Sequence, residues 1–143
     1  MPELTSYALD GAIATIAMDD GKVNALSPAM LGELMSGLER AEDDEAIVVL
    51  TGRASTFSAG FDLRVPPEGW PEMITAGARL AERIMSHPRP VIAACNCNAI
   101  AMGAFALLSC DVVVQHSGLG GGHRSSMSAR GEVRAASNAG FMR

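Results

Sequence analysis

Residues 47–63 read IVVLTGRASTFSAGFDL, and this stretch decides the fold class. Its first part, residues 47–52, is a short continuous apolar run that ends at a glycine, which is typical of a strand buried on both faces. Its second part, residues 55–63, is a loop rich in small residues around Gly60. A buried strand followed by such a loop is typical of α/β folds, which bind ligands beyond the carboxyl ends of their strands.

Helices are predicted on both sides of this stretch. Ser27 and Pro28 place an N-cap and a proline at the first helical position, so we expect a helix over residues 28–43. Residues 71–86 form a second amphipathic pattern that Pro88 stops, and Gly77 on its apolar stripe weakens it slightly. The apolar positions of the first helix recur at helical spacing: Met30, Leu31, Leu34, Leu38 and Ala41.

The remaining elements complete an alternating pattern. A hairpin is predicted over residues 7–18, around the tight turn at Asp10 and Gly11. Residues 91–95 resemble another buried strand, residues 103–108 a short helix and residues 111–114 a fourth strand. Strands that alternate with helices predict an α/β fold with a parallel sheet and crossover helices.

Composition bounds the possible functions. The chain has 143 residues, which is room for one domain, and 48% of them are hydrophobic, so a packed core is expected. A net charge of −5 argues against a nucleic-acid partner, because phosphate binding needs clustered Lys and Arg. The N-terminus does not resemble a secretory signal, and the most apolar stretch, residues 99–110, is too short to span a membrane.

Three cysteines give little sign of chemistry. Cys95 and Cys97 lie too close in sequence for a usual disulfide, and no second cysteine pair or suitably spaced histidine completes a zinc site. We predict buried, small apolar roles for all three cysteines, including Cys110, and no bound metal. A reducing, cytoplasmic location is the corresponding expectation.

Two small-residue turns are the best candidates for chemistry. Residues 57–63 and residues 98–105 both follow predicted strands, and the second turn also opens a helix. Small side chains let a ligand approach the backbone, and the first N–H groups of a helix lack internal partners. The two turns could supply a pair of donors to one oxygen, an oxyanion hole. Taken alone, the spacing fits plain connections between elements better.

The order and wording of three segments resemble the crotonase (enoyl-CoA hydratase/isomerase) superfamily over residues 7–114. These are DDGKVNAL at residues 19–26, FSAGFDL at residues 57–63, and RPVIA at residues 89–93 followed by Asn96 and AMGA at residues 101–104. The resemblance implies repeated β-β-α units, here incomplete, that bind an acyl-CoA thioester. Coenzyme A would enter as part of the substrate, with no separate cofactor. Relatives are commonly homo-oligomers, either trimers or hexamers.

The resemblance also implies roles for individual residues. The backbone N–H groups of Phe61 and Met102 match the two oxyanion donors, with Gly103 as the second donor if the register slips by one residue. Residues that match the stretches along the coenzyme A moiety and the thioester are Lys22, Val23, Asn24, Ala25, Ala59, Gly60, Asp62 and Leu63.

The sequence departs from the family at its acids. Phe105 stands where hydratases of the family carry the first catalytic glutamate, and a phenyl ring cannot transfer a proton. Downstream of Asp111 the one acid is Glu132, whose setting does not match the second glutamate. We therefore expect weak or no hydration activity. Asp62 is expected to be a loop or cap carboxylate rather than a general base, and His87 to cap the carbonyls that end its helix.

Residues 115–143 change character. They carry four Lys and Arg against one acid, whereas residues 1–114 carry seven against fifteen. We predict that this Gly/Ser/Arg-rich tail does not form a domain and is disordered. We hypothesise that its sequence is out of frame or degenerate. His116 and His123 have no metal-ligand spacing, and the glycines of residues 118–122 resemble a phosphate loop but fit a linker better.

Three functions stay open at this point. The chain could be an enoyl-CoA hydratase/isomerase-family protein with impaired catalysis. It could be a non-catalytic acyl-CoA-binding protein or the subunit of a hetero-oligomer. It could also be a non-functional fragment. The first is the leading hypothesis, and the second explains why the turns are retained while the acids are missing.

Overall fold

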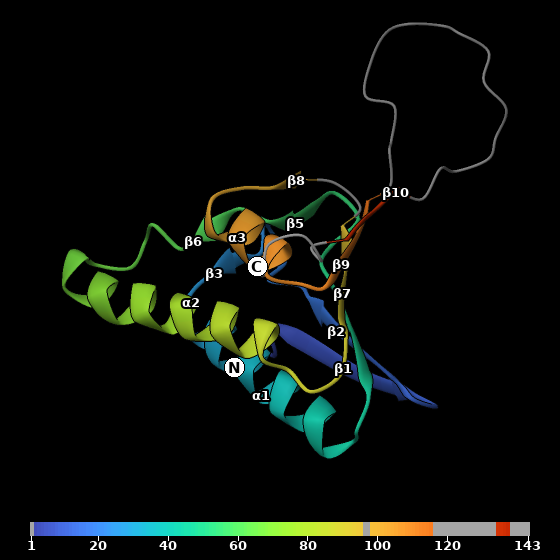
Figure 1. The fold of residues 1–143 in the computed structure, drawn as a ribbon. Helices are drawn as coiled ribbons and strands as arrows, with labels where there is room; N and C mark the ends of the chain where they lie inside the picture. The colour runs from blue at the N-terminus through green and yellow to red at the C-terminus, as the bar shows by residue number, and fades with distance from the viewer. Residues whose placement is uncertain (1, 96–97, 116–133, 138–143) are drawn as a thin grey trace, which may run out of the picture.

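The computed structural model describes residues 2–95, 98–115 and 134–137, which form a mixed six-stranded sheet in the order β1-β2-β4-β7-β9-β10 (Figure 1). The hairpin of β1 and β2 is antiparallel, β2, β4, β7 and β9 run parallel, and β10 returns antiparallel to β9. The predicted parallel sheet is confirmed. The strands are β1 (Thr5–Asp10), β2 (Ile13–Met18), β4 (Ile47–Thr51), β7 (Val91–Cys95), β9 (Val112–Gln115) and β10 (Arg134–Ser137).

Two helices lie side by side against one face of the sheet (Figure 1). Helix α1 spans Pro28–Asp43, as predicted, and the Oγ of Ser27 caps it by accepting the N–H of Met30 at 3.1 Å. Helix α2 spans Trp70–Met85, one residue earlier than expected, and a short 3₁₀ turn, η1 (Pro67–Gly69), leads into it. Each helix bridges two parallel strands, as crossover connections require.

The core lies between these helices and the sheet. Val48 and Leu50 of β4 are buried, whereas Val49 between them is half-buried on the other face. The prediction that β4 is buried on both faces is therefore wrong, because α1 and α2 cover one face only. The apolar stripe predicted for α1 is confirmed, since all five of its residues are buried.

Two small sheets form where the sequence indicated loops. Strand β3 (Ala25–Leu26) pairs with β6 (Gly60–Phe61), and β5 (Thr56–Ser58) pairs with β8 (Asn98–Ala99). Helix α3 (Met102–Leu108) follows β8 directly. These pieces lie beyond the ends of β2, β4 and β7, and they bring the two small-residue turns together.

Part of the tail departs from expectation. Residues 134–137 form β10 on the edge of β9, so the prediction of a fully disordered tail is wrong for these four residues. Glu132, His116, His123 and residues 118–122 lie outside the described residues, as do Asn96 and Cys97. Cys95 and Cys110 are buried, as predicted.

None of the helices in the described part of the chain combines the length and the apolar character of a membrane span.

Candidate functional site

The first small-residue turn is fixed by a buried asparagine. Asn24 is 0% exposed, and its side-chain amide donates to the carbonyl oxygens of Met18 at 3.0 Å and Phe57 at 3.1 Å. Its φ of 52° lies in the left-handed region, which Asn tolerates better than most residues. The side chain of Asn24 therefore holds the loop. The side chains near it that a ligand could reach are those of Lys22 and Val23, which are exposed, and of Ala25, which is half-buried.

Ser58 joins the same loop to the next strand. Its hydroxyl donates to the carbonyl of Asn24 at 2.7 Å and accepts the N–H of Gly60 at 3.1 Å. Its carbonyl accepts the N–H of Ile100 at 3.0 Å. Ser58 thus ties residues 24, 60 and 100 together, a role that no pattern in the sequence indicates.

The two turns touch at Gly60. A β-carbon at this position would stand 3.0 Å from the carbonyl oxygen of Ile100, 3.1 Å from the Cβ of Ala101 and 3.3 Å from the backbone nitrogen of Met102. Gly60 also has a φ of 92°, which side-chain-bearing residues rarely adopt. The absence of a side chain is what lets residues 100–102 approach β6 this closely.

The backbone N–H of Phe61 faces away from β3. Its neighbour Asp62 donates its N–H to the carbonyl of Leu26 at 3.3 Å. Successive N–H groups of an extended strand point to opposite edges, so that of Phe61 points away from β3.

The second predicted donor lies at the start of α3. Met102 is the first residue of this helix, where N–H groups have no partner within the helix. The N–H of Gly103 donates to the carbonyl of Ile100 at 2.9 Å, so Met102 fits the role better than the one-residue slip to Gly103. Ala101 before it has φ 51° and ψ −122°, a strained conformation of the kind that collects at functional sites.

The side chains of Phe61 and Met102 also meet. A β-carbon on Gly77 of α2 would stand 2.6 Å from the ring Cζ of Phe61 and 3.2 Å from the terminal methyl of Met102. Both side chains therefore pack against the same bare stretch of α2. A glycine within the buried stripe of a helix was the sequence signal for this contact.

The acid beside the turn is committed to an ion pair. Asp62 accepts two hydrogen bonds from the guanidinium of Arg64, at 2.9 and 2.8 Å, and a third from its backbone N–H at 3.0 Å. The Arg64 side chain holds the pKa of Asp62 below its usual range, and burial opposes this only in part. A low pKa makes a weak base, so Asp62 is a loop carboxylate, as expected.

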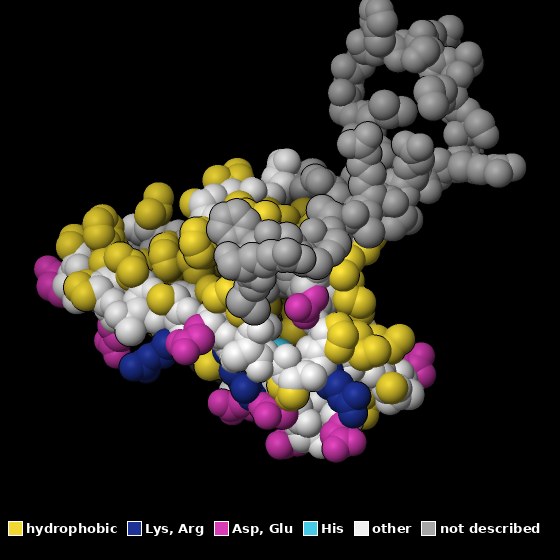
Figure 2. Space-filling view, in the orientation of Figure 1, with side chains coloured by type: hydrophobic (Ala, Val, Ile, Leu, Met, Phe, Trp, Pro, Cys, Tyr) yellow, Lys and Arg dark blue, Asp and Glu magenta, His cyan; other side chains and the backbone are white. Residues whose placement is uncertain are grey.

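The other predicted positions vary in exposure. Leu63 is exposed, Ala59 is half-buried, and Phe105 is 64% exposed on α3, one helical turn after Met102. Hydrophobic side chains gather over the N-terminal half of α2 (Figure 2), where Trp70 and Ile74 are exposed.

The side chain of His87 does not cap its own helix as predicted, although its backbone N–H donates to the carbonyl of Ile84 near the end of α2 at 3.4 Å. Its Nε2 lies 3.2 Å from the carbonyl of Leu38 on α1, and its Nδ1 lies 3.0 Å from the carbonyl of Arg89. His87 lies beyond the end of α2 at Met85, and its ring is buried against α1. His87 is thus a structural contact between elements.

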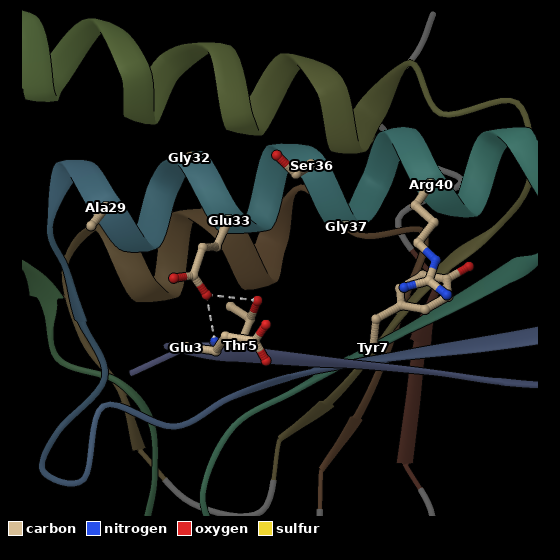
Figure 3. Close-up of a pocket in the computed structure, with 9 residues that line it drawn as sticks. All are labelled: Glu3, Thr5, Tyr7, Ala29, Gly32, Glu33, Ser36, Gly37 and Arg40. Atoms are coloured by element: carbon tan, nitrogen blue, oxygen red, sulfur yellow. Dashed lines mark hydrogen bonds between the residues drawn. The ribbon is translucent and has the colours of Figure 1, made fainter. Parts of the chain in front are cut away.

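A groove of about 670 Å³ lies apart from these turns, between β1 and α1 (Figure 3). It is lined by Thr5 and Tyr7 from the strand and by small residues of the helix, including Gly32. The guanidinium of Arg40 stacks on the ring of Tyr7, 4.1 Å from its centre. None of the predicted site residues lines this groove. In the described part of the chain, no three His, Cys, Asp or Glu side chains gather as a metal site.

Comparison with known proteins decides the family. The sequence profile of the enoyl-CoA hydratase/isomerase family matches residues 9–118. The chain belongs to this family. The predicted crotonase resemblance and α/β fold class are therefore confirmed.

Relatives support the assignment in sequence and in structure. A putative enoyl-CoA hydratase from Thermus thermophilus is 40% identical over 114 residues, covering 73% of this chain and 45% of that protein. A 4-chlorobenzoyl coenzyme A dehalogenase from Arthrobacter is 34% identical over 113 residues, covering 71% and 41%. The structure of an enoyl-CoA hydratase/isomerase family protein from Pseudomonas syringae matches with a TM-score of 0.78 and 42% identity, over 80% of this chain and 51% of that one. This crotonase-family chain thus spans about half the length of the relatives it matches.

Proposed function

We propose that this chain binds an acyl-CoA thioester, and that the backbone N–H groups of Phe61 and Met102 both donate to its carbonyl oxygen. The observation that carries the proposal is the close approach at Gly60, where a β-carbon would stand 3.3 Å from the nitrogen of Met102. Gly60 precedes Phe61 directly, so the two donors come from segments in contact. Relatives named for enoyl-CoA and chlorobenzoyl-CoA chemistry fit a thioester ligand.

The two donors suit a developing negative charge. Both are backbone groups held by neighbouring secondary structure, so they need little rearrangement when charge appears on the oxygen. Met102 adds the positive end of a short helix. In the proposed complex, Lys22, Val23 and Ala25 lie along the coenzyme A moiety, and Ala59 to Leu63 support its adenine end and the thioester.

We also propose that catalysis is impaired. General acid–base steps need a titratable group near the reacting atoms. Phe105 occupies the position of the first family glutamate, and Asp62 is held ionised by Arg64. The chain would then hold and polarise a thioester without hydrating an enoyl group efficiently. A non-catalytic acyl-CoA-binding role follows from the same observations.

Titration calorimetry with acetyl-CoA and with free coenzyme A tests binding. We expect saturable binding of acetyl-CoA, weakened by Gly60→Ala, which places a methyl between the two turns. Equal affinity for acetyl-CoA and coenzyme A would rule out a role for the carbonyl. A spectrophotometric assay with crotonyl-CoA tests catalysis, and turnover at ordinary enzyme rates would contradict the proposal that catalysis is impaired.

Assembly and location belong to the same proposal. Family resemblance favours a homo-oligomer, a trimer or a hexamer, and the cysteine content favours a reducing, cytoplasmic location. Light scattering coupled to gel filtration measures the assembly, and a monomer over the accessible concentration range would contradict it.

A further inference from the structure

We propose that Gly77 is the positioning residue that seats both oxyanion donors, by letting the side chains of Phe61 and Met102 pack against the bare backbone of α2. This inference rests on the proposed function. Gly77 lies 16 positions from Phe61 and 25 from Met102 in the sequence, on a different element from either. The sequence pattern indicated only that this glycine weakens a helix.

The contact distances single out Gly77. A β-carbon there would stand 2.6 Å from Cζ and 2.7 Å from Cε1 of the Phe61 ring, and 3.2 Å from the terminal methyl of Met102. The closest atoms around Gly60 and Gly103 include backbone atoms of the neighbouring turn. At Gly77 the three nearest atoms all belong to the side chains of the two residues whose N–H groups form the proposed hole.

A mid-helix glycine has a cost that this arrangement explains. Glycine is about 1 kcal/mol less favourable than alanine within a helix. Gly77 nevertheless stands on the buried stripe of α2, between Met73 and Leu80. An alanine would suit the helix better, and the space it would need is filled by the Phe61 ring.

The ring transmits the position of α2 to the donor. Phe61 and Met102 are both half-buried and pack on the main core. Phe61 belongs to β6, which pairs with β3, so a ring pushed off α2 must either swing on its side-chain torsions or shift the backbone that carries the N–H. Because Met102 shares the same contact, a methyl at Gly77 acts on both donors at once. Misplacing a reacting group by about 1 Å can cost a factor of about one hundred in rate.

The test compares two ligands across five proteins, one of them a control variant. Acetyl-CoA carries the thioester carbonyl, and its thioether analogue ethyl-CoA lacks it. Binding of both is measured by calorimetry for the wild-type chain, Gly77→Ala, Phe61→Leu and the double variant. Leucine at position 61 keeps the backbone N–H and removes the ring atoms that the new methyl would meet. Gly32→Ala is the matched control, because Gly32 lies mid-helix in α1 and a β-carbon there meets nothing within 4 Å.

We expect Gly77→Ala to weaken acetyl-CoA binding roughly fivefold to tenfold, the worth of one hydrogen bond, and to leave ethyl-CoA binding within about twofold. In the Phe61→Leu background the same substitution should have less than half that effect on log affinity. Gly32→Ala should leave both affinities unchanged. In ¹⁵N spectra of the unliganded protein, the amide signals of Phe61 and Met102 should shift in Gly77→Ala and stay in place in Gly32→Ala.

Two results would overturn the inference while leaving the proposed oxyanion hole intact. Equal weakening of both ligands would show that Gly77 only maintains the fold, and unchanged binding of both would show that the ring swings aside without moving the donors. A wild-type chain that binds acetyl-CoA no better than ethyl-CoA would instead refute the proposed oxyanion hole, and this inference with it.

Discussion

The carboxylate of Glu33 on α1 accepts a hydrogen bond from the backbone N–H of Thr5 on β1 at 2.7 Å (Figure 3). The same oxygen also accepts the N–H of Leu4 at 2.8 Å and the hydroxyl of Thr5 at 3.1 Å. Strand β1 is the edge of the sheet, where unpaired N–H groups invite pairing with another chain. One helix carboxylate therefore satisfies donors at the start of this edge.

Glu33→Gln should lower the free energy of unfolding by about 1 kcal/mol, because the oxygen remains but its charge-assisted bonds become ordinary ones. Urea unfolding followed by circular dichroism measures the difference. Glu39→Gln, at an exposed position of the same helix, is the control. A change at Glu33 no larger than at Glu39 would show that these bonds add nothing to stability.

Asn24→Ala should cost about 2 to 4 kcal/mol of unfolding free energy. The substitution leaves the carbonyls of Met18 and Phe57 without their buried donor, and it places alanine at a positive φ. Asn24→Gly removes the same bonds and relieves the φ, so the difference between the two variants should be about 1 kcal/mol. Urea denaturation of both variants gives the values. Two variants of near wild-type stability would contradict the structural role of the amide.

The framework of the fold was accessible from local sequence. Helix α1 was predicted at both ends because Ser27 and Pro28 mark its start and its apolar spacing is regular. The hairpin was predicted from the turn at Asp10 and Gly11, and Gly11 has the positive φ, 56°, that such a turn requires. The two-residue strands β3, β6 and β8 could not be predicted, because so few residues carry no alternation and their pairing is fixed by packing between distant segments.

The site was accessible only in outline. The family motifs indicated Phe61 and Met102 as candidate donors. The contacts of Ser58 with Ile100 and of Gly77 with Phe61 span 42 and 16 positions, so local sequence does not indicate them. Periodicity also indicated strands buried on both faces, since an apolar run does not tell how many layers cover it. Asn24 was predicted to lie along coenzyme A from its position in the motif; its side chain is fully buried and holds the loop, a role that the motif did not indicate.

Stability should fall with acid in a way that depends on Asp62. The Arg64 side chain lowers the pKa of this carboxyl in the folded chain, whereas the unfolded value is about 3.9. The stabilisation is therefore fully present above that pH and is lost as the pH falls through the lower folded pKa. Urea midpoints measured between pH 7 and pH 2.5 should fall less steeply in Asp62→Asn than in the wild type. Asp43→Asn, an exposed position at the end of α1, should keep the wild-type slope; equal slopes in all three proteins would contradict the prediction.

Ala101→Gly should raise the free energy of unfolding by about 1 kcal/mol. The φ of 51° and ψ of −122° strain a residue with a β-carbon, and relief of about 1 to 3 kcal/mol exceeds the added chain entropy of glycine. Thermal melts of the two proteins give the sign. A lower melting temperature in Ala101→Gly would show that the turn is not strained at this residue.

Phe105→Glu tests whether a missing acid limits the chemistry. Phe105 is 64% exposed, so its replacement should change stability by less than about 0.5 kcal/mol. The new carboxyl would stand one helical turn after Met102, where the family resemblance places the first glutamate. Acid–base groups contribute about a hundredfold or more when well placed, and one acid of two should raise crotonyl-CoA hydration at least tenfold. Phe105→Gln is the control, because the glutamine side chain has nearly the shape of glutamate but cannot transfer a proton at neutral pH. Equal rates in the Glu and Gln variants would mean that the loss of this acid is not what limits the chain, and that a carbonyl held by Phe61 and Met102 does not lie within reach of position 105.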